Sequence, residues 1–152
     1  YWTLVRFGQW EEMLKEPAPP SSNAYLTGAW HYARGQAFAG TGRLTEAKAE
    51  LAALGEKLIG VDGGFNCITC HAVGEKEATA VFEAPAINFA ESAERLRKGY
   101  FHRWVLAPTR IDPDTKMPKY ADPEGVTQLS DPYEGKGPDQ FEAIRQYIRT
   151  VK

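Results

Sequence analysis

Two cysteines and a histidine stand together in the stretch Cys67-Ile68-Thr69-Cys70-His71, and these residues are the best suited to chemistry in the chain. Two thiols at this spacing can form thioether bonds to the two vinyl groups of one porphyrin. The imidazole that follows can bind the iron as the proximal ligand. The chain has no other cysteine. The spacing therefore predicts covalent attachment of one haem c through Cys67 and Cys70, with His71 on the iron.

Other uses of the two cysteines are weaker. A dithiol redox pair usually begins a helix beside a βαβ unit, and no strand pattern surrounds this one. A structural zinc ion needs four ligands, and the remaining histidines, His31 and His102, have no paired spacing. A disulfide between Cys67 and Cys70 would close too small a loop to add much stability. Haem attachment is the interpretation that uses all three residues of the motif.

The composition is that of an ordinary globular protein and narrows the class of partner. Of the 152 residues, 43% are hydrophobic and 25% are charged, which is typical of a folded domain. The net charge of −2, with mixed signs, gives no basic surface, so we expect no nucleic-acid partner. No apolar run reaches the length of a membrane-spanning helix, so we expect no transmembrane segment.

Helical periodicity runs through the first third of the chain, and no convincing alternating strand occurs anywhere, which predicts an all-α protein. Residues 29–54 read as two helices joined at Gly42, because glycine commonly follows the last turn of a helix. Their apolar stripes are Trp30, Ala33, Ala37 and Phe38 in the first helix, then Leu44, Ala47, Leu51 and Leu54 in the second.

The small and large residues of this hairpin fall at Gly35, Phe38, Gly42, Leu44, Ala47 and Leu54. With this spacing the segment resembles a tetratricopeptide repeat, although Arg34 stands at a normally apolar position. An earlier stretch repeats the pattern, with Gly8 at the place of Gly42 and Trp10 at that of Leu44. About one and a half repeats would leave apolar side chains partly uncovered, namely Trp2, Val5, Trp10, Leu14 and Trp30.

The second part of the chain has features that surround the haem motif in a known family. Gly55 and Ile59 lie four residues apart on one helical pattern. A terminal helix over residues 138–151 has an apolar stripe formed by Phe141, Ile144, Ile148 and Val151. With the motif, these features resemble class I (monohaem) cytochrome c, in which the two helices cross at the glycine. This resemblance implies a cytochrome domain at 55–152. The repeat-like segment at 1–54 precedes it without a flexible linker.

The same resemblance implies the other contacts of the haem. Met117 stands before a proline in an irregular loop, as the distal ligand does in class I cytochromes, so we expect it on the iron. The stretch Ala84-Pro85-Ala86-Ile87 is an imperfect match to the family's Gly-Pro-x-Leu pattern. We expect the Pro85 carbonyl to accept a hydrogen bond from the proximal histidine.

Apolar side chains should enclose the haem, and polar ones should bind its propionates. The expected wall consists of Phe65, Ile68, Val73, Ile87, Leu96, Phe101, Trp104, Val105, Ile111 and Tyr120. Trp104 and Arg110 are the best-placed propionate donors. His102 in place of Met117, or a vacant sixth position, is the alternative ligation.

These features predict an electron carrier rather than an enzyme, because His71 and Met117 would fill both axial positions. We expect redox partner proteins. We also expect a repeat segment that caps the haem domain, docks another protein or self-associates, with a multi-haem polymer as one form of self-association. The alternative is a cytochrome subunit of a larger dehydrogenase or peroxidase-type complex. Class I cytochromes receive their haem outside the cytoplasm, so we expect a periplasmic, secreted or cell-surface protein whose leader has been removed, or else a fragment of a longer chain.

Overall fold

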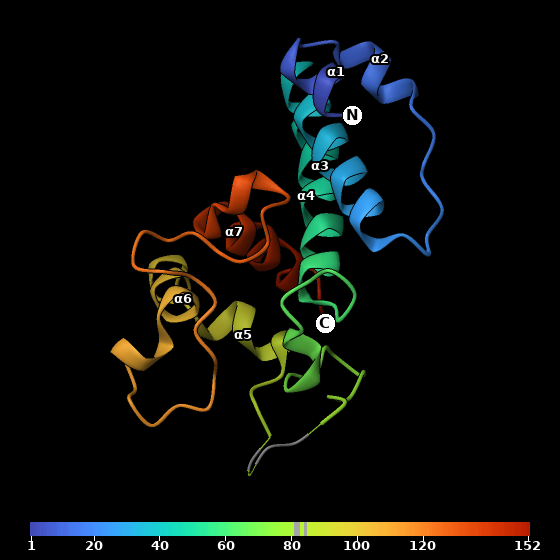
Figure 1. The fold of residues 1–152 in the computed structure, drawn as a ribbon. Coiled ribbons are helices and arrows are strands. Elements are labelled where there is room, and N and C mark those ends of the chain that lie inside the picture. The colour runs from blue at the N-terminus through green and yellow to red at the C-terminus, as the bar shows by residue number, and fades with distance from the viewer. Residues whose placement is uncertain (81–82, 84) are drawn as a thin grey trace.

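The computed structural model describes residues 1–80, 83 and 85–152, and α-helices dominate its secondary structure (Figure 1). Isolated β-bridges are the only pairing of extended backbone within the described residues, so the all-α expectation is confirmed. The α-helices are α1 Trp2–Arg6, α2 Trp10–Lys15, α3 Ala24–Gly40, α4 Leu44–Ile59, α5 Phe89–Arg95, α6 Lys98–Leu106 and α7 Gly137–Ile148. Three short 3-10 turns are η1 Cys67–Thr69, η2 Pro108–Arg110 and η3 Tyr133–Gly135.

Helices α3 and α4 form the predicted hairpin. Asn23 begins α3, because its side-chain oxygen accepts a hydrogen bond from the Leu26 N–H at 3.0 Å. Gly42 turns the chain at a φ of +76°, a conformation that glycine adopts without strain. One detail of the apolar stripe is wrong: Leu44 is 61% exposed, because it starts α4 at the end of the hairpin.

Helices α1 and α2 form a shorter hairpin with a similar glycine turn. Gly8 has a φ of +65°, close to that of Gly42, and α2 begins two residues later. A small core forms between α2 and α3, where Met13 and Ala33 are fully buried. The Trp10 indole lies over Gly40, where an added Cβ would come within 2.6 Å of the ring. The apolar residues of α1 and α2 are therefore partly covered by this packing, and Trp2 remains 40% exposed.

Helix α4 runs unbroken from the hairpin into the second part of the chain, which confirms the expected absence of a flexible linker. Leu54, Leu58 and Ile59 at its C-terminal end belong to a larger core that includes α6 and α7. A side chain at position 55 would overlap the backbone carbonyl of Ala143 in α7. Gly55 therefore allows the backbones of α4 and α7 to touch where the helices cross, as expected.

Aromatic contacts hold the hairpin against the loop before α7. The Tyr32 ring of α3 lies between Trp2, at 5.1 Å, and Tyr133, at 4.8 Å between ring centroids. The Tyr25 hydroxyl donates a hydrogen bond to Asp131 at 3.2 Å. These contacts join segments that are distant in the sequence and fix the N-terminal helices relative to α7.

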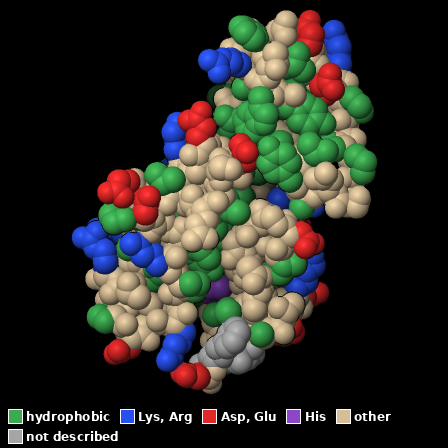
Figure 2. Space-filling view, viewed as in Figure 1, with side chains coloured by type: hydrophobic (Ala, Val, Ile, Leu, Met, Phe, Trp, Pro, Cys, Tyr) green, Lys and Arg blue, Asp and Glu red, His purple; other side chains and the backbone are tan. Residues whose placement is uncertain are grey.

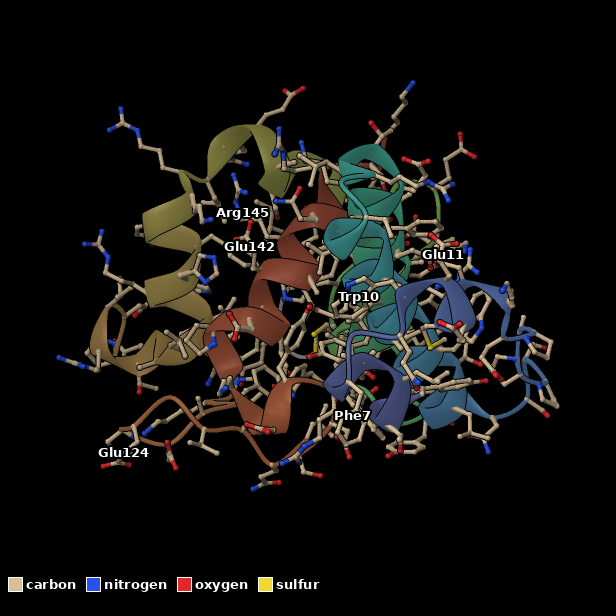
Figure 3. The ribbon with its side chains drawn as sticks, turned by 90° about the horizontal axis from the view of Figure 1, so that it is seen from above. Phe7, Trp10, Glu11, Glu124, Glu142 and Arg145 are labelled. Atoms are coloured by element: carbon tan, nitrogen blue, oxygen red, sulfur yellow. The ribbon has the colours of Figure 1, made fainter. Side chains whose placement is uncertain are left out.

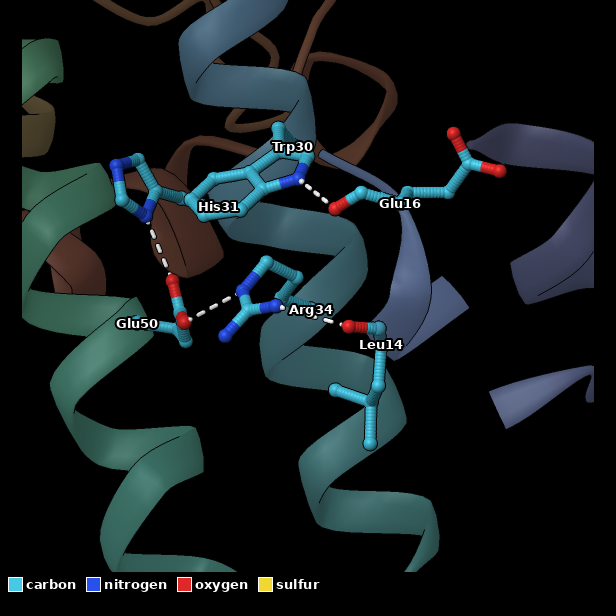
Figure 4. Close-up of polar contacts among 6 residues, drawn as sticks. All are labelled: Leu14, Glu16, Trp30, His31, Arg34 and Glu50. Atoms are coloured by element: carbon cyan, nitrogen blue, oxygen red, sulfur yellow. Dashed lines mark hydrogen bonds and ion pairs between the residues drawn. The ribbon is translucent and has the colours of Figure 1, made fainter. Parts of the chain in front are cut away.

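An ion-pair network explains Arg34 at its normally apolar position (Figure 4). Its guanidinium lies 4.4 Å from the centroid of the Trp30 ring and donates from Nε to Glu50 at 2.8 Å. Glu50 also bonds His31 Nδ1 at 2.6 Å, so His31 is engaged within the hairpin. Burial opposes ionisation of Glu50, but the hydrogen bonds from His31 and Arg34 outweigh it and hold the pKa of Glu50 below its usual range.

The close crossing of α4 and α7 predicts that alanine substitutions at Gly55 and Gly99 change the stability of the protein differently. Gly55→Ala should reduce the free energy of unfolding by about 1–3 kcal/mol, because the new methyl group must push α4 and α7 apart. Gly99→Ala is the matched control, since Gly99 is also helical but has no neighbouring atom within 4 Å of the added Cβ. The control should be neutral or stabilise by about 0.5–1 kcal/mol. Chemical denaturation measures both, and equal stability of Gly55→Ala and wild type would contradict the close crossing.

Candidate functional site

An apolar cavity lies between α5, α6, α7 and the two irregular segments that face them. Its empty volume is about 590 Å³ including the open mouth, within the range of small-molecule and cofactor sites. Figure 2 shows hydrophobic side chains and a histidine in a hollow in the lower half of the molecule. The lining residues are Cys67, His71, Ile87, Phe89, Ser92, Leu96, Phe101, Trp104, Val105, Met117, Tyr120, Phe141, Ile144 and Ile148.

Of the four residues predicted to attach the haem or ligate its iron, the cavity brings together three. Cys67 is the first residue of the turn η1, His71 follows the end of that turn, and Met117 enters the cavity from the long loop after α6. Cys70 ends the turn, where its N–H donates to the Cys67 carbonyl at 3.2 Å, and it is partly buried without lining the cavity. Both cysteines are free in this structure. Burial raises the pKa of the Cys67 thiol to about 12.

His71 is held by one hydrogen bond and one aromatic contact. Its Nδ1 lies 2.7 Å from the Ile87 carbonyl oxygen, and because a carbonyl can only accept, Nδ1 carries the hydrogen. Burial lowers the pKa of His71, although the bond to Ile87 opposes this shift. The ring is also stacked on Phe89, with 4.6 Å between centroids. A neutral His71 therefore keeps its Nε2 lone pair available for a metal ion.

The expected role of the Pro85 carbonyl is wrong, because the acceptor lies two residues later at Ile87. Asn88 sets this register: its side chain accepts from the Gly74 N–H at 3.0 Å and donates to the Gly74 carbonyl at 2.8 Å. The adjacent Phe89 N–H donates to the Ala72 carbonyl at 2.9 Å. These bonds place Ile87 beside His71, and Pro85 is exposed. Ala84, the first residue of the matched pattern, lies outside the described residues.

Met117 is held at both its backbone and its sulfur. Its N–H donates to the Thr115 hydroxyl at 3.3 Å, and the Trp104 indole N–H donates to its Sδ at 2.9 Å. The expected role of Trp104 as a propionate donor has no support here, because its only N–H points to the sulfur. Arg110 is exposed on η2 and does not line the cavity, so the structure gives no support to its expected role.

Most of the expected apolar wall is present. Six predicted residues line the cavity: Ile87, Leu96, Phe101, Trp104, Val105 and Tyr120. Phe65, Ile68 and Val73 instead pack in the surrounding core, and Ile111 is 41% exposed. Sequence reasoning missed Phe89, Ser92, Phe141, Ile144 and Ile148. The terminal helix stripe was a usable signal for the last three, because the face of α7 that packs on α4 extends into the cavity wall.

The alternative ligand His102 is engaged elsewhere. Its Nε2 lies 2.7 Å from Glu142 Oε2, so it joins α6 to α7 and is absent from the cavity lining. Figure 3 shows Glu142 and Arg145 on the side of α7 that faces α6. Burial opposes ionisation of Glu142, but hydrogen bonds from His102 and Gln146 together with the Lys98 charge hold its pKa below the usual range. The geometry therefore favours Met117 over His102 as the residue opposite His71.

Comparisons with known protein families, curated proteins and solved structures find no match. Within the described residues, no three His, Cys, Asp or Glu side chains gather to hold a metal ion. In the same part of the chain, no helix is both long and apolar enough to cross a membrane.

The donor set at the cavity fits a haem c. One wall offers a partly buried thiol and an oriented, neutral imidazole, and another offers a thioether sulfur. Ser92 and Tyr120 carry the hydroxyl groups among the described lining residues, and Ser92 Oγ donates to the Asn88 carbonyl at 3.3 Å. The remaining surface suits an apolar macrocycle, because few polar groups there would lose hydration on its burial.

Substitution of Asn88 tests how the hydrogen-bond partner of His71 is positioned. Asn88→Ala should lower the free energy of unfolding by about 1–3 kcal/mol, because it removes an N-cap and two bonds to the Gly74 backbone. Asn23→Ala is the matched control, since Asn23 caps α3 far from the cavity. It should cost only about 1 kcal/mol. Thermal unfolding and the ¹⁵N NMR signals of the His71 ring measure both effects. If Asn88→Ala leaves the His71 signals unchanged, Asn88 does not set the register at Ile87.

Proposed function

We propose that this chain is an extracytoplasmic electron carrier with one haem c, attached through Cys67 and Cys70 and ligated by His71 and Met117. The observation that carries the proposal is the convergence of Cys67, His71 and Met117 on one apolar cavity from distant parts of the sequence. When bound, the haem supplies a one-electron iron couple. Class I cytochrome c is the proposed fold of residues 55–152, supported by the α4–α7 crossing at Gly55.

The chain's own residues orient the two proposed axial ligands. The Ile87 carbonyl fixes the tautomer of His71 and makes its free nitrogen a better donor. The stacked ring of Phe89 prevents His71 from turning out of the cavity. His71 and Met117 would both hold the iron of a bound haem. A small substrate would then have no open coordination position, which favours electron transfer over catalysis.

The cavity wall would set the dielectric constant around a bound haem. Phe101, Val105 and Phe141 are buried and apolar, so they exclude water and lower the local dielectric constant. Burial of this kind disfavours the more highly charged ferric state and raises the reduction potential. A thioether ligand acts in the same direction.

The N-terminal segment, residues 1–54, is proposed as a tetratricopeptide-like docking surface for a redox partner protein or for further copies of the chain. Hydrophobic side chains gather over these helices in the upper part of Figure 2. Phe7 is 72% exposed and Trp2 is 40% exposed, and both lie in or beside α1. Large apolar and aromatic side chains of this kind are enriched at protein interfaces. Repeated head-to-tail association would bring haems of successive copies into a polymer.

Self-association predicts a concentration-dependent mass. Sedimentation velocity over a hundredfold range of concentration should show oligomers that Phe7→Ser weakens. Among the described residues, this change removes the most exposed large apolar side chain. Val126→Ser is a control, since Val126 is 46% exposed in the loop before α7. A strict monomer at the highest concentration would rule out self-assembly and leave docking to a different protein.

The chain's two methionines provide a matched test of the ligand. In the haem-loaded protein, Met117→Leu should abolish the far-red sulfur-to-iron band, lower the reduction potential and allow carbon monoxide to bind. Met13→Leu is the same substitution in the small core of α2 and α3, where Met13 is fully buried, and it should change none of these properties. Visible spectroscopy and potentiometry measure both variants. A wild-type band that survives in Met117→Leu would show that another residue binds the iron.

A further inference from the structure

We infer that Trp104 is a positioning residue for Met117: its indole N–H holds one lone pair of the thioether sulfur and leaves the other free for a bound metal. This role rests on the proposed function, because it concerns the distal ligand of the same cavity. The carrying observation is the 2.9 Å separation of Trp104 Nε1 and Met117 Sδ.

The direction of the Trp104 N–H is fixed by its helix. Trp104 lies on α6 between Phe101 and Val105, which are both buried in the larger core and anchor this face of the helix. One turn earlier, the Tyr100 ring is stacked with the indole, with 6.1 Å between centroids and 16° between planes. The donor therefore comes from a rigid element and meets a ligand that lies in a loop.

The Met117 sulfur needs such a partner. A methionine side chain has three rotatable bonds and a weak acceptor, so packing alone orients its sulfur poorly. The surrounding loop is shaped by short local bonds, from the Asp114 N–H to Asp112 at 3.1 Å and from the Met117 N–H to Thr115 at 3.3 Å. These bonds place the backbone of Met117 and do not reach the sulfur. Trp104 supplies the hydrogen bond that does.

The hydrogen bond has two consequences for a bound iron. Because a thioether sulfur has two lone pairs, one can accept from Trp104 while the other binds the metal. The positive end of the N–H dipole also draws electron density from the sulfur. It thereby disfavours the additional positive charge of the ferric state, so Trp104 should raise the reduction potential.

Trp104→Phe removes the N–H and keeps an aromatic ring on α6. In the haem-loaded variant, the equilibrium constant for reduction should fall by about two- to tenfold, the range expected for one net hydrogen bond. The sulfur-to-iron band should also disappear at a lower temperature than in wild type. Tyr100→Phe is the control, because it keeps the stacked ring and loses a hydroxyl that has no bond to Met117. It should leave both readouts unchanged.

An unchanged potential and an unchanged band in Trp104→Phe would overturn the inference. A lower potential with an unchanged band would also overturn it, because Trp104 would then act on the haem by another route, such as a propionate. These outcomes differ from failure of the proposed function, which would appear in the wild-type protein as the absence of covalent haem or of the sulfur-to-iron band.

A measurement on the wild-type protein covers the case in which Trp104→Phe does not fold. In ¹⁵N NMR of the ferrous protein, the Trp104 indole hydrogen should exchange slowly with solvent. It should also show a nuclear Overhauser effect to the Met117 methyl group. Rapid exchange without that contact would overturn the inference.

Discussion

The backbone contact between α4 and α7 at Gly55 is the constraint on which the arrangement of the molecule depends. Because position 55 has no side chain, the carbonyl of Ala143 can approach the α4 backbone directly. One end of α4 carries the N-terminal hairpin, and the other end packs in the larger core. On α7, Phe141, Ile144 and Ile148 continue from this crossing into the cavity wall. The same contact thus joins the two parts of the chain and places one wall of the site.

His71 and Met117 lie in segments with little regular structure, and specific hydrogen bonds hold these segments against the helices. Asn88 fixes the register of residues 87–89 against the turn that carries His71. Trp104 reaches from α6 to the sulfur of Met117. Each proposed axial ligand is therefore held by a group on a neighbouring segment. Preorganised ligands of this kind suit electron transfer, since little needs to move when the charge of a bound iron changes.

The sequence was sufficient to predict the helical class, the hairpin turn at Gly42 and the terminal helix, because glycine positions and apolar periodicity are local signals. It also selected Cys67, His71 and Met117, which the structure brings to one cavity. Hydrogen-bond partners were harder to predict. The Ile87 carbonyl, rather than that of Pro85, accepts the hydrogen bond from His71, because the side chain of Asn88 sets the register. Every residue has a backbone carbonyl, so the sequence does not indicate which one is the acceptor. Likewise, the Trp104 bond to Met117 depends on the path of a loop that periodicity does not describe.

Covalent haem attachment is the central claim, and a reduced-minus-oxidised visible spectrum with a pyridine haemochrome assay tests it most directly. The chain should be produced with an extracytoplasmic leader in a host that attaches haem c, beside a Cys67→Ser, Cys70→Ser control. One haem per chain that stays with the protein in denaturant, with the haemochrome spectrum of two thioether bonds, is the predicted result. A wild-type protein that is colourless, or that loses its haem in denaturant as the control does, would contradict the account.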